Sequence, residues 1–480
     1  MSSSKSTATA AASPKKPGKN KSTKNKPVKS APSQSDEANM SPAERERLEK
    51  IRAQFDRAPY PNQPLEAKPT AWKLYQHCLV TAYHRRNQKL IDTQGKKILD
   101  VGCGSGFGML TLALANPGTT LVGVDLSPAS LDMAQKRMEH HGFGDRCRFE
   151  VVKLEELDKL LPEKFDFINC DELLYLQPDP AVGLKSMQSI LADDGIIRTN
   201  LHSAMQRTHF FRAQELARSM GLMQGNPGQK EVQIFRQLFE SLKPTVPLRQ
   251  QTWRPEQADS ESYYMMNYLF HEDRGFTIAH IFDCLTRAGL DWIGMVDWQT
   301  WRIEDLMNEA TGMPDFLQQG LAQASEAAKL HVHDLLASSH RLLDFYCGQP
   351  NAASEWLPVD QWEPDDWQTA KISLNPQLNT DLFKQSLSNA VTYFQDLQLR
   401  PFFNTGWGIN NISGALVIGL VPLMEGTKTF AELVDYWQKV NPVDPGTLAP
   451  TTVEQASAPL RHLLKEMARW GYVLPERMNA

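Results

Sequence analysis

A glycine-rich turn after a short apolar run constrains the fold of this chain more than any other stretch. Ile98, Leu99 and Val101 form a run typical of a buried parallel strand. Glycines then occupy alternate positions, 102, 104 and 106, and the apolar residues 109–115 can open a helix. Glycine lets the backbone turn sharply and lets a ligand approach it closely. The order strand, glycine turn, helix predicts the start of a nucleotide-binding βαβ unit.

The glycine spacing excludes two common nucleotide sites. A dinucleotide-binding G-x-G-x-x-G motif would need its third glycine at Phe107 or Met109, depending on the register. A P-loop would need G-x-x-x-x-G-K-[ST], which this stretch lacks. The pattern present is D-x-G-x-G-x-G, from Asp100 to Gly106. A second apolar run ends in Asp125, about twenty residues past the glycines, where a carboxylate can accept hydrogen bonds from ribose hydroxyls.

These two motifs, in this order, resemble those of class I S-adenosylmethionine (SAM) methyltransferases. The resemblance covers about residues 60–303. It implies an α/β fold, a Rossmann-like doubly wound sheet of the class I methyltransferase type, with a helical insertion and a mainly helical C-terminal domain. It also implies SAM as the cofactor. The residues that it assigns to SAM are Asp100, Gly102, Cys103, Gly104, Gly106, Asp125, Leu126, Leu154, Glu155 and Asn169.

The adenine side of the expected site departs from the family pattern. Members of the family usually follow the third strand, here 146–152, with an acid that binds the adenine amino group. This chain has Lys153 there, and an ammonium cannot accept a hydrogen bond. Either Glu155 takes this role, or the backbone around Leu154 contacts the ring alone.

The segment before the first strand is the next candidate region. Residues 71–91 are predicted to be helical and are rich in aromatic residues. In the family this segment often closes over the cofactor and the substrate, so the resemblance makes Tyr60, Tyr83 and Arg85 candidates for contacts with the SAM methionine end or the acceptor. The aromatic residues could equally pack the helix on the sheet.

Four residues are candidates for a catalytic base. Methyl transfer from a sulfonium is an in-line displacement, so the protein mainly aligns the reactants and excludes water. Ligands of a doubly wound sheet lie beyond the carboxyl ends of its strands, here the ends of the runs 165–170 and 195–202. The candidates there are Asp171, Glu172, Tyr175 and His202. His202 suits the task best because histidine titrates near neutral pH, although it could instead cap or pack.

Composition and pattern divide the chain into three regions. Residues 1–40 are a Lys-rich, low-complexity tail that we expect to be disordered. Residues 41–303 form the predicted methyltransferase domain, which opens with an amphipathic helix over 41–58 and carries a helical insertion at 203–275. Residues 304–480 form a mainly helical C-terminal region, with a long helical pattern over 321–347 and a winged-helix-like module at 428–475.

Three functions fit these features. The insertion is rich in methionine and aromatic residues, which favours an apolar or adaptable acceptor site. A helical unit with its own small core would have the same composition. The first hypothesis is a SAM-dependent methyltransferase acting on a small or lipid-like acceptor. The alternatives are a protein (lysine) methyltransferase, because the order of segments loosely resembles bacterial protein-lysine methyltransferases, and a non-enzymatic SAM-binding regulator. The intact Asp100, glycines and Asp125 favour an active enzyme over a pure regulator, because they imply a competent cofactor site.

Charge and cysteine content limit the partners and the compartment. The chain carries a net charge of −5 and residues 1–35 hold eight lysines and no acid, so the remainder is near −13 and suits a large nucleic-acid partner poorly. Six cysteines without a C-x-x-C pair predict a cytoplasmic protein without a metal site or disulfide scaffold. The longest apolar run, 412–424, is too short to span a membrane, and no signal-peptide pattern begins the chain.

Overall fold

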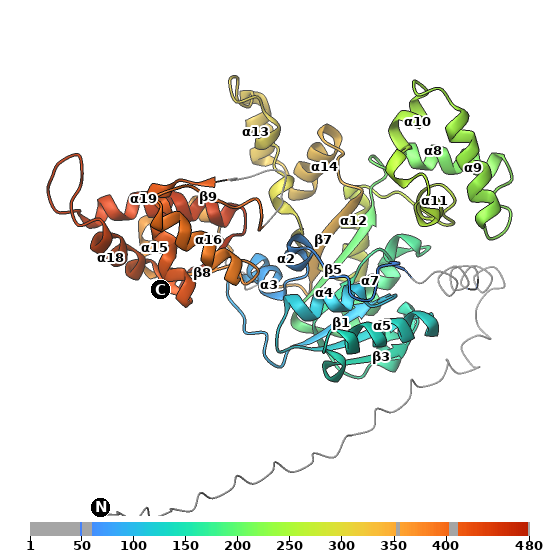
Figure 1. Ribbon diagram of the computed structural model, residues 1–480, viewed down its shortest axis with the longest axis horizontal. Coiled ribbons are helices and arrows are strands. Elements are labelled where there is room, and N and C mark those ends of the chain that lie inside the picture. The colour runs from blue at the N-terminus through green and yellow to red at the C-terminus, as the bar shows by residue number, and fades with distance from the viewer. Residues whose placement is uncertain (1–48, 50–59, 352–355, 403–410, 479–480) are drawn as a thin grey trace, which may run out of the picture.

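A seven-stranded sheet forms the centre of the computed structural model, which describes residues 49, 60–351, 356–402 and 411–478 (Figure 1). The strand order is β3-β2-β1-β4-β5-β7-β6. From β1, the strands β2 and β3 extend the sheet toward one edge, and the strands from β4 onward extend it toward the other edge. In this sheet β7 pairs antiparallel with both β5 and β6, and all the other strand pairs are parallel. The strands are β1 (Lys97–Val101), β2 (Thr120–Asp125), β3 (Cys147–Val151), β4 (Phe165–Cys170), β5 (Leu191–His202), β6 (Asp291–Met295) and β7 (Leu342–Gly348).

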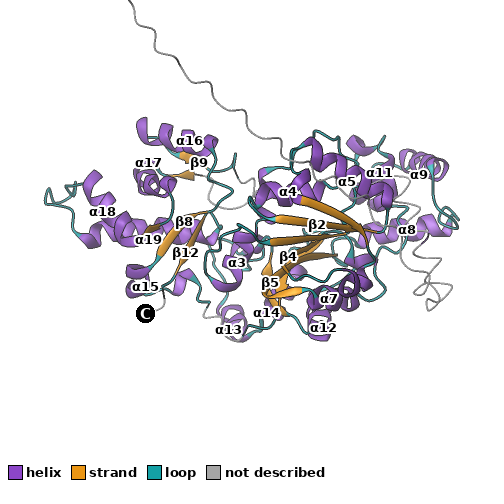
Figure 2. Ribbon diagram, turned by 90° about the horizontal axis from the view of Figure 1, so that it is seen from below, coloured by secondary structure: helices purple, strands orange, loops and turns teal. Residues whose placement is uncertain are grey.

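Helices cover both faces of this sheet (Figure 2). Successive strand residues point to opposite faces, so Ile98 and Leu99 of β1 lie in two different apolar clusters. The Ile98 cluster also contains residues of α3, α4 and α5, and the Leu99 cluster contains residues of α7, α12 and α14. The central domain is therefore the predicted doubly wound fold. Its helices are α2 (Ala71–Gln76), α3 (Leu79–Asn87), α4 (Phe107–Ala115), α5 (Pro128–His140), α6 (Leu157–Leu160), α7 (Pro180–Ser189), α12 (Ile278–Ala288), α13 (Asp315–Gln323) and α14 (Glu326–Leu336).

The sheet continues past the boundary predicted at residue 303. The helical pattern over 321–347 is wrong at its C-terminal end, because residues 342–348 form β7 between β5 and β6. The apolar run of β7 is buried on both faces of the sheet, and such a run resembles a buried helix in sequence. Five predicted strands are confirmed, with bounds that shift by a few residues: the runs at 98–101, 146–152, 165–170 and 195–202 and the run that ends in Asp125.

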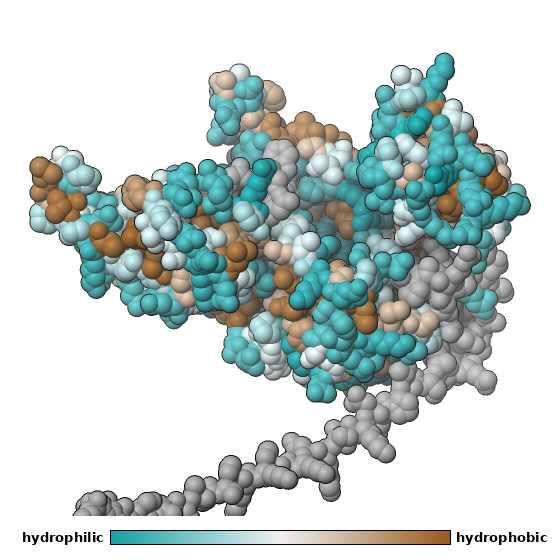
Figure 3. All heavy atoms as spheres, in the orientation of Figure 1, coloured by the Kyte–Doolittle hydropathy of each residue, from teal (hydrophilic) through white to brown (hydrophobic). Residues whose placement is uncertain are grey.

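The predicted insertion is helical and has an apolar core of its own. It contains α8 (Thr208–Ser219), α9 (Gln229–Ser241), α10 (Pro247–Thr252) and α11 (Glu261–Asn267). Phe235, Phe239 and Tyr268 are fully buried in this core. The surface of the insertion is mostly hydrophilic on the side seen in Figure 3. Most aromatic side chains of the insertion therefore stabilise the insertion itself.

The C-terminal region packs around a small sheet of its own. Its central strand β8 (Lys371–Leu374) pairs antiparallel with β11 (Lys428–Thr429) and β12 (Val473–Glu476). The range 428–475 contains two helices and the strand β12, but the sheet beside them depends on β8, which lies far upstream. The remaining elements are β9 (Leu397–Gln398), β10 (Asn411–Ile412), α15 (Pro364–Thr369), α16 (Asp381–Thr392), α17 (Gly414–Val417), α18 (Phe430–Val440) and α19 (Val453–Arg469).

Polar contacts join this region to the central domain. The Gln299 amide donates to the hydroxyl of Tyr75 and to the carbonyl of Trp470, and His84 contacts the carbonyl of Pro475. No helix within the described ranges is long and apolar enough to cross a bilayer. The predictions of a tail at 1–40 and a helix at 41–58 fall outside the described residues, apart from residue 49.

Candidate active site

The glycine turn has the backbone that its sequence predicts. Gly102, Gly104 and Gly106 have φ angles of 72°, 50° and 81°, which favour glycine. A β-carbon on Gly106 would lie 2.6 Å from the Cα of Ala134, so this glycine is also needed for the approach of α5. The thiol of Cys103 is buried, and burial raises its pKa well above the ordinary value, so it is a packing group rather than a nucleophile.

The turn and the end of β2 meet through Asp125. One carboxylate oxygen of Asp125 accepts from the backbone N–H of Gly104 at 2.9 Å, and the other accepts from that of Ser127 at 2.9 Å. Leu126 follows Asp125 and is partly exposed. These contacts fix a carboxylate beside the glycine turn at the carboxyl edge of the sheet, where the predicted ribose contact requires one.

Asp100 presents an unpaired carboxylate oxygen behind the same turn. Its Oδ1 accepts from the Asn169 amide at 2.7 Å, while its buried Oδ2 has no hydrogen-bond partner among the described residues. Burial raises the pKa of Asp100 to about 7. An oxygen of this kind fits a cationic ligand group such as the amino group of SAM. Asn169 is fully buried between Asp100 and Arg198, so it supports Asp100 from behind.

On the adenine side of the site, Lys153 stands where the family usually has an acid. Leu154 is buried, and its carbonyl accepts from the Ser186 hydroxyl at 2.6 Å. Glu155 is exposed, whereas Glu156 is buried and lies 3.7 Å from the Lys153 ammonium. The two predicted adenine contacts, from Glu155 or from the backbone around Leu154, stay predictions.

Asp171 follows β4 and sits in a cluster of charges. Its Oδ1 accepts from the Asn200 amide, and its Oδ2 lies 3.6 Å from Arg198 and 3.9 Å from His77. Burial opposes its charge, but Arg198, Lys73 and His77 outweigh burial and hold the pKa of Asp171 below its ordinary value. Its side chain is 27% exposed, so an ionised carboxylate faces the ligand side of the sheet.

Arg198 is the fully buried centre of this cluster. It forms an ion pair with Asp344 of β7 and donates to the Asn169 amide oxygen at 2.8 Å. Burial opposes the charge of Arg198, but Asp344 and Asp171 outweigh it and raise its pKa. Arg198 was not predicted from the sequence, although an arginine within an apolar strand is a detectable signal, because buried arginines need acidic partners.

Glu172, Tyr175 and His202 form a second group. Glu172 has a φ of 54° and holds Arg341 in a bidentate pair at 2.6 and 3.0 Å. The Tyr175 ring stacks on His202 with 3.7 Å between ring centroids. Burial raises the pKa of Tyr175 well above 10, so its hydroxyl stays protonated. Tyr60 lies against the glycine turn, where its carbonyl accepts from the Ser105 N–H at 2.9 Å, and the Glu172 carboxylate raises the pKa of its hydroxyl.

Both ring nitrogens of His202 already have partners. Nδ1 lies 2.6 Å from the Asp273 carboxylate, and Nε2 lies 2.9 Å from the guanidinium of Arg341. Arg341 can only donate, so the ring is neutral, with Nδ1 carrying the proton. Burial lowers the pKa of His202 to about 4. Its predicted role as a base stays a prediction, and in this geometry its lone pair is already engaged.

Two further candidates contact other parts of the protein. The Tyr83 hydroxyl donates to Asp194 at 3.2 Å, near the amino end of β5 and thus opposite the ligand edge. Arg85 lies against Trp298 and Trp356. The expectation that Tyr83 and Arg85 contact SAM is therefore wrong, because α3 directs both side chains elsewhere. In the described part of the chain, no three His, Cys, Asp or Glu side chains form a group that could hold a metal ion.

Comparisons with known proteins agree with this fold. Residues 92–268 match the model of a methyltransferase domain family. An uncharacterised protein of Synechococcus sp. is 28% identical over 272 residues, which are 55% of this chain and 63% of that protein. A ubiquinone biosynthesis O-methyltransferase of Actinobacillus pleuropneumoniae is 36% identical over 112 residues, 23% of this chain and 47% of that protein. The chain thus spans about half to under two thirds of these curated relatives.

Solved structures show the same fold. PKMT2 from Rickettsia typhi superimposes with a TM-score of 0.57 at 15% identity, covering 85% of this chain and 76% of that one. The structure of PKMT2 in complex with AdoHcy gives a TM-score of 0.56 at 16% identity, covering 85% and 77% of the two chains. At this identity the likeness concerns the fold, and it extends over the central and the C-terminal regions.

Proposed function

The chain belongs to the class I SAM-dependent methyltransferases through its domain at residues 92–268, and on that premise we propose that it transfers the methyl group of SAM to a small acceptor. SAM supplies a sulfonium methyl that is already activated for displacement. Asp125 binds the ribose, Asp100 faces the amino group, and the glycine turn lets the cofactor approach the backbone. The protein then has to align an acceptor and exclude water.

The observation that supports the acceptor side is the partly exposed, ionised carboxylate of Asp171. A carboxylate with a lowered pKa is a weak base but a strong hydrogen-bond acceptor. We infer that Asp171 accepts a hydrogen bond from the acceptor's hydroxyl or amine and so orients its lone pair. The ion pair of Glu172 and Arg341 lies next to Asp171, and the Tyr60 hydroxyl can donate a hydrogen bond to the acceptor.

This assignment changes the chemistry expected for the acceptor. The aromatic residues of the insertion were the argument for a lipid-like acceptor, and most of them pack within the insertion's own core. Charged groups surround the carboxyl ends of β4 and β5 instead, which favours a small acceptor with a polar group. The curated relatives named as ubiquinone biosynthesis O-methyltransferases support an oxygen acceptor, but the similarity covers only 23% of this chain.

The test is labelled methyl transfer by the full-length protein. The protein and SAM with a labelled methyl group are incubated with the low-molecular-weight fraction and, separately, with the protein fraction of a cell lysate. We expect label in a small molecule, and we expect Asp171→Asn to reduce the rate by about a hundredfold because the acceptor is misaligned. SAM affinity should stay within about threefold of the wild type, because Asp171 is assigned to the acceptor.

Asp179→Asn is the matched control, because Asp179 is an exposed carboxylate paired with Arg287. It should transfer methyl groups at the wild-type rate. Label that enters only polypeptides would refute the small acceptor. Equal rates in Asp171→Asn and wild type would refute the role of Asp171, and absence of transfer in both fractions by a protein that binds SAM would refute the activity.

A further inference from the structure

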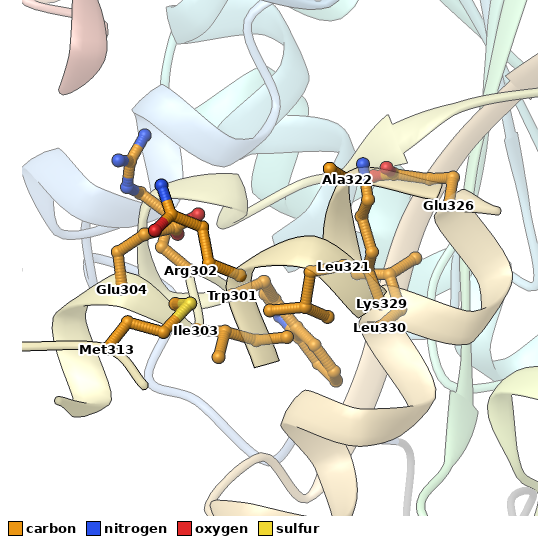
Figure 4. A pocket seen from close by; sticks show the side chains of 11 residues that line it. Trp301, Arg302, Ile303, Glu304, Met313, Leu321, Ala322, Glu326, Lys329 and Leu330 are labelled. Atoms are coloured by element: carbon orange, nitrogen blue, oxygen red, sulfur yellow. The ribbon is translucent and has the colours of Figure 1, made fainter. Parts of the chain in front are cut away.

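A cavity of about 440 Å³ lies between the central domain and the C-terminal region. Its walls come from α3, β6, α14 and α19, and its volume is within the range of small-molecule sites. It adjoins a second cavity of about 570 Å³, in which Arg302 and Glu304 lie on one side and Glu326 and Lys329 of α14 on the other (Figure 4). None of the residues assigned to SAM or to the acceptor lines either cavity.

Arg85 of α3 has an unusual environment in the first cavity. Its guanidinium lies 4.6 Å from the ring of Trp298 and 5.3 Å from that of Trp356. It makes no hydrogen bond or ion pair with a described residue, and its buried Nε lacks an acceptor. Arg85 keeps part of its surface accessible, and the desolvation of the remainder lowers its pKa.

The neighbouring arginine shows what the fold does when it satisfies such a group. Arg86 is buried, and it donates to the backbone carbonyls of Gly195 and Gln349. Arg85 has the opposite arrangement, with aromatic rings beside the guanidinium and no acceptor at its N–H groups. Contact with aromatic faces stabilises a guanidinium while its in-plane N–H groups stay available, and two such groups match a carboxylate or phosphate in a bidentate pair.

The charges around Arg85 favour an anion. Lys329 and Lys465 line the same cavity and form no ion pair with a described residue, whereas Arg302 and Arg469 are paired with Asp305. Glu326 is the acid whose charge acts on Arg85, yet its carboxylate is not within ion-pair distance of it. Glu304 and Asp360 also line the cavity, but Glu326 is the acid that acts on Arg85 and is therefore the main internal competitor of an incoming anion.

We propose that this cavity binds a small molecule through a carboxylate or phosphate group, which pairs with the in-plane N–H groups of Arg85 beside Trp298 and Trp356. The site is separate from the proposed methyl-transfer site and does not depend on that function. Because its walls include α3 and α19, a bound ligand would connect the sheet domain to the C-terminal region.

The test is a titration of the full-length protein with inorganic phosphate and, separately, with succinate, at constant ionic strength. Tryptophan fluorescence reports binding because two indoles contact Arg85. We expect a saturable change for at least one of the two anions, and the more effective one identifies the group that the site prefers. Arg85→Gln should need at least about tenfold more anion, as expected when a charged bidentate contact is lost. Glu326→Gln should need several-fold less, because it removes the competing carboxylate.

Two further variants keep the test decisive. Arg218→Gln, which removes an exposed arginine of the insertion, should titrate like the wild type. If Arg85→Gln does not fold, Arg85→Lys keeps the charge but not the bidentate geometry, and it should still need several-fold more anion. A non-saturable response of the wild type to both anions, or the same saturation in the Arg85 variants, would overturn the proposal.

Discussion

Replacing Asp273 by asparagine should strongly destabilise the protein. Asp273 is fully buried, and it lies 2.6 Å from His202, 2.5 Å from Arg207 and 2.7 Å from the Gln214 amide. All three groups donate to the carboxylate. Asparagine keeps the size of the side chain, but it removes the charge and turns one acceptor into a donor.

The magnitude follows from Arg207. Its guanidinium is fully buried, and Asp273 is its acidic partner in the described structure. Removing one member of a buried pair leaves an uncompensated charge, which costs about 3–5 kcal/mol. Asp179→Asn breaks an ion pair whose two side chains are 40% and 47% exposed, so it should cost about 1 kcal/mol or less.

Urea unfolding followed by circular dichroism measures both variants. The midpoint of Asp273→Asn should fall far below that of Asp179→Asn. Equal midpoints would refute the reasoning, because they would mean that the Asp273 charge is not needed to keep Arg207 buried.

The remaining predictions concern pH and the cofactor. His202 has a folded pKa of about 4, so the unfolded chain binds its proton first, and stability should fall by up to about 3 kcal/mol as pH drops from 6.5 to 4. Urea midpoints across this range should show the loss, and His202→Gln should make it shallower without abolishing it, because burial also lowers the pKa of His84 and His340 to about 4; an equally steep loss in that variant would contradict the assignment. Asp100 has a pKa raised to about 7, so SAM affinity should weaken as pH falls below 7 and the carboxyl gains a proton. Calorimetry should detect this loss in the wild type, and Asp100→Asn should bind weakly at every pH; a pH-independent wild type would contradict it.

The sequence predicted the part of the fold that depends on local patterns. The strands β1, β2 and β4 are short apolar runs, and the turn at Gly102–Gly106 has a backbone that few other residues adopt. β7 was missed because its apolar run follows α14 closely, and periodicity alone does not separate a buried strand from a helix.

The candidate site was predictable where it is built from neighbours in sequence. Asp100, Asp125 and Asp171 each lie at or just past the carboxyl end of a strand, and parallel strands bring these ends to one edge. The environment of His202 could not be predicted, because its partners Asp273 and Arg341 lie 71 and 139 residues away. The two hydrogen bonds that keep the His202 ring neutral therefore depend on tertiary packing.

The measurement that most directly tests the account is calorimetric titration of SAM and of its demethylated product into the wild type and Asp125→Ala. The account predicts binding of both ligands to the wild type at micromolar concentrations and at least about tenfold weaker binding to the variant, which loses the ribose contact. Absence of binding to the wild type, or equal binding to the variant, would contradict the assignment of the glycine turn and Asp125 as the cofactor site.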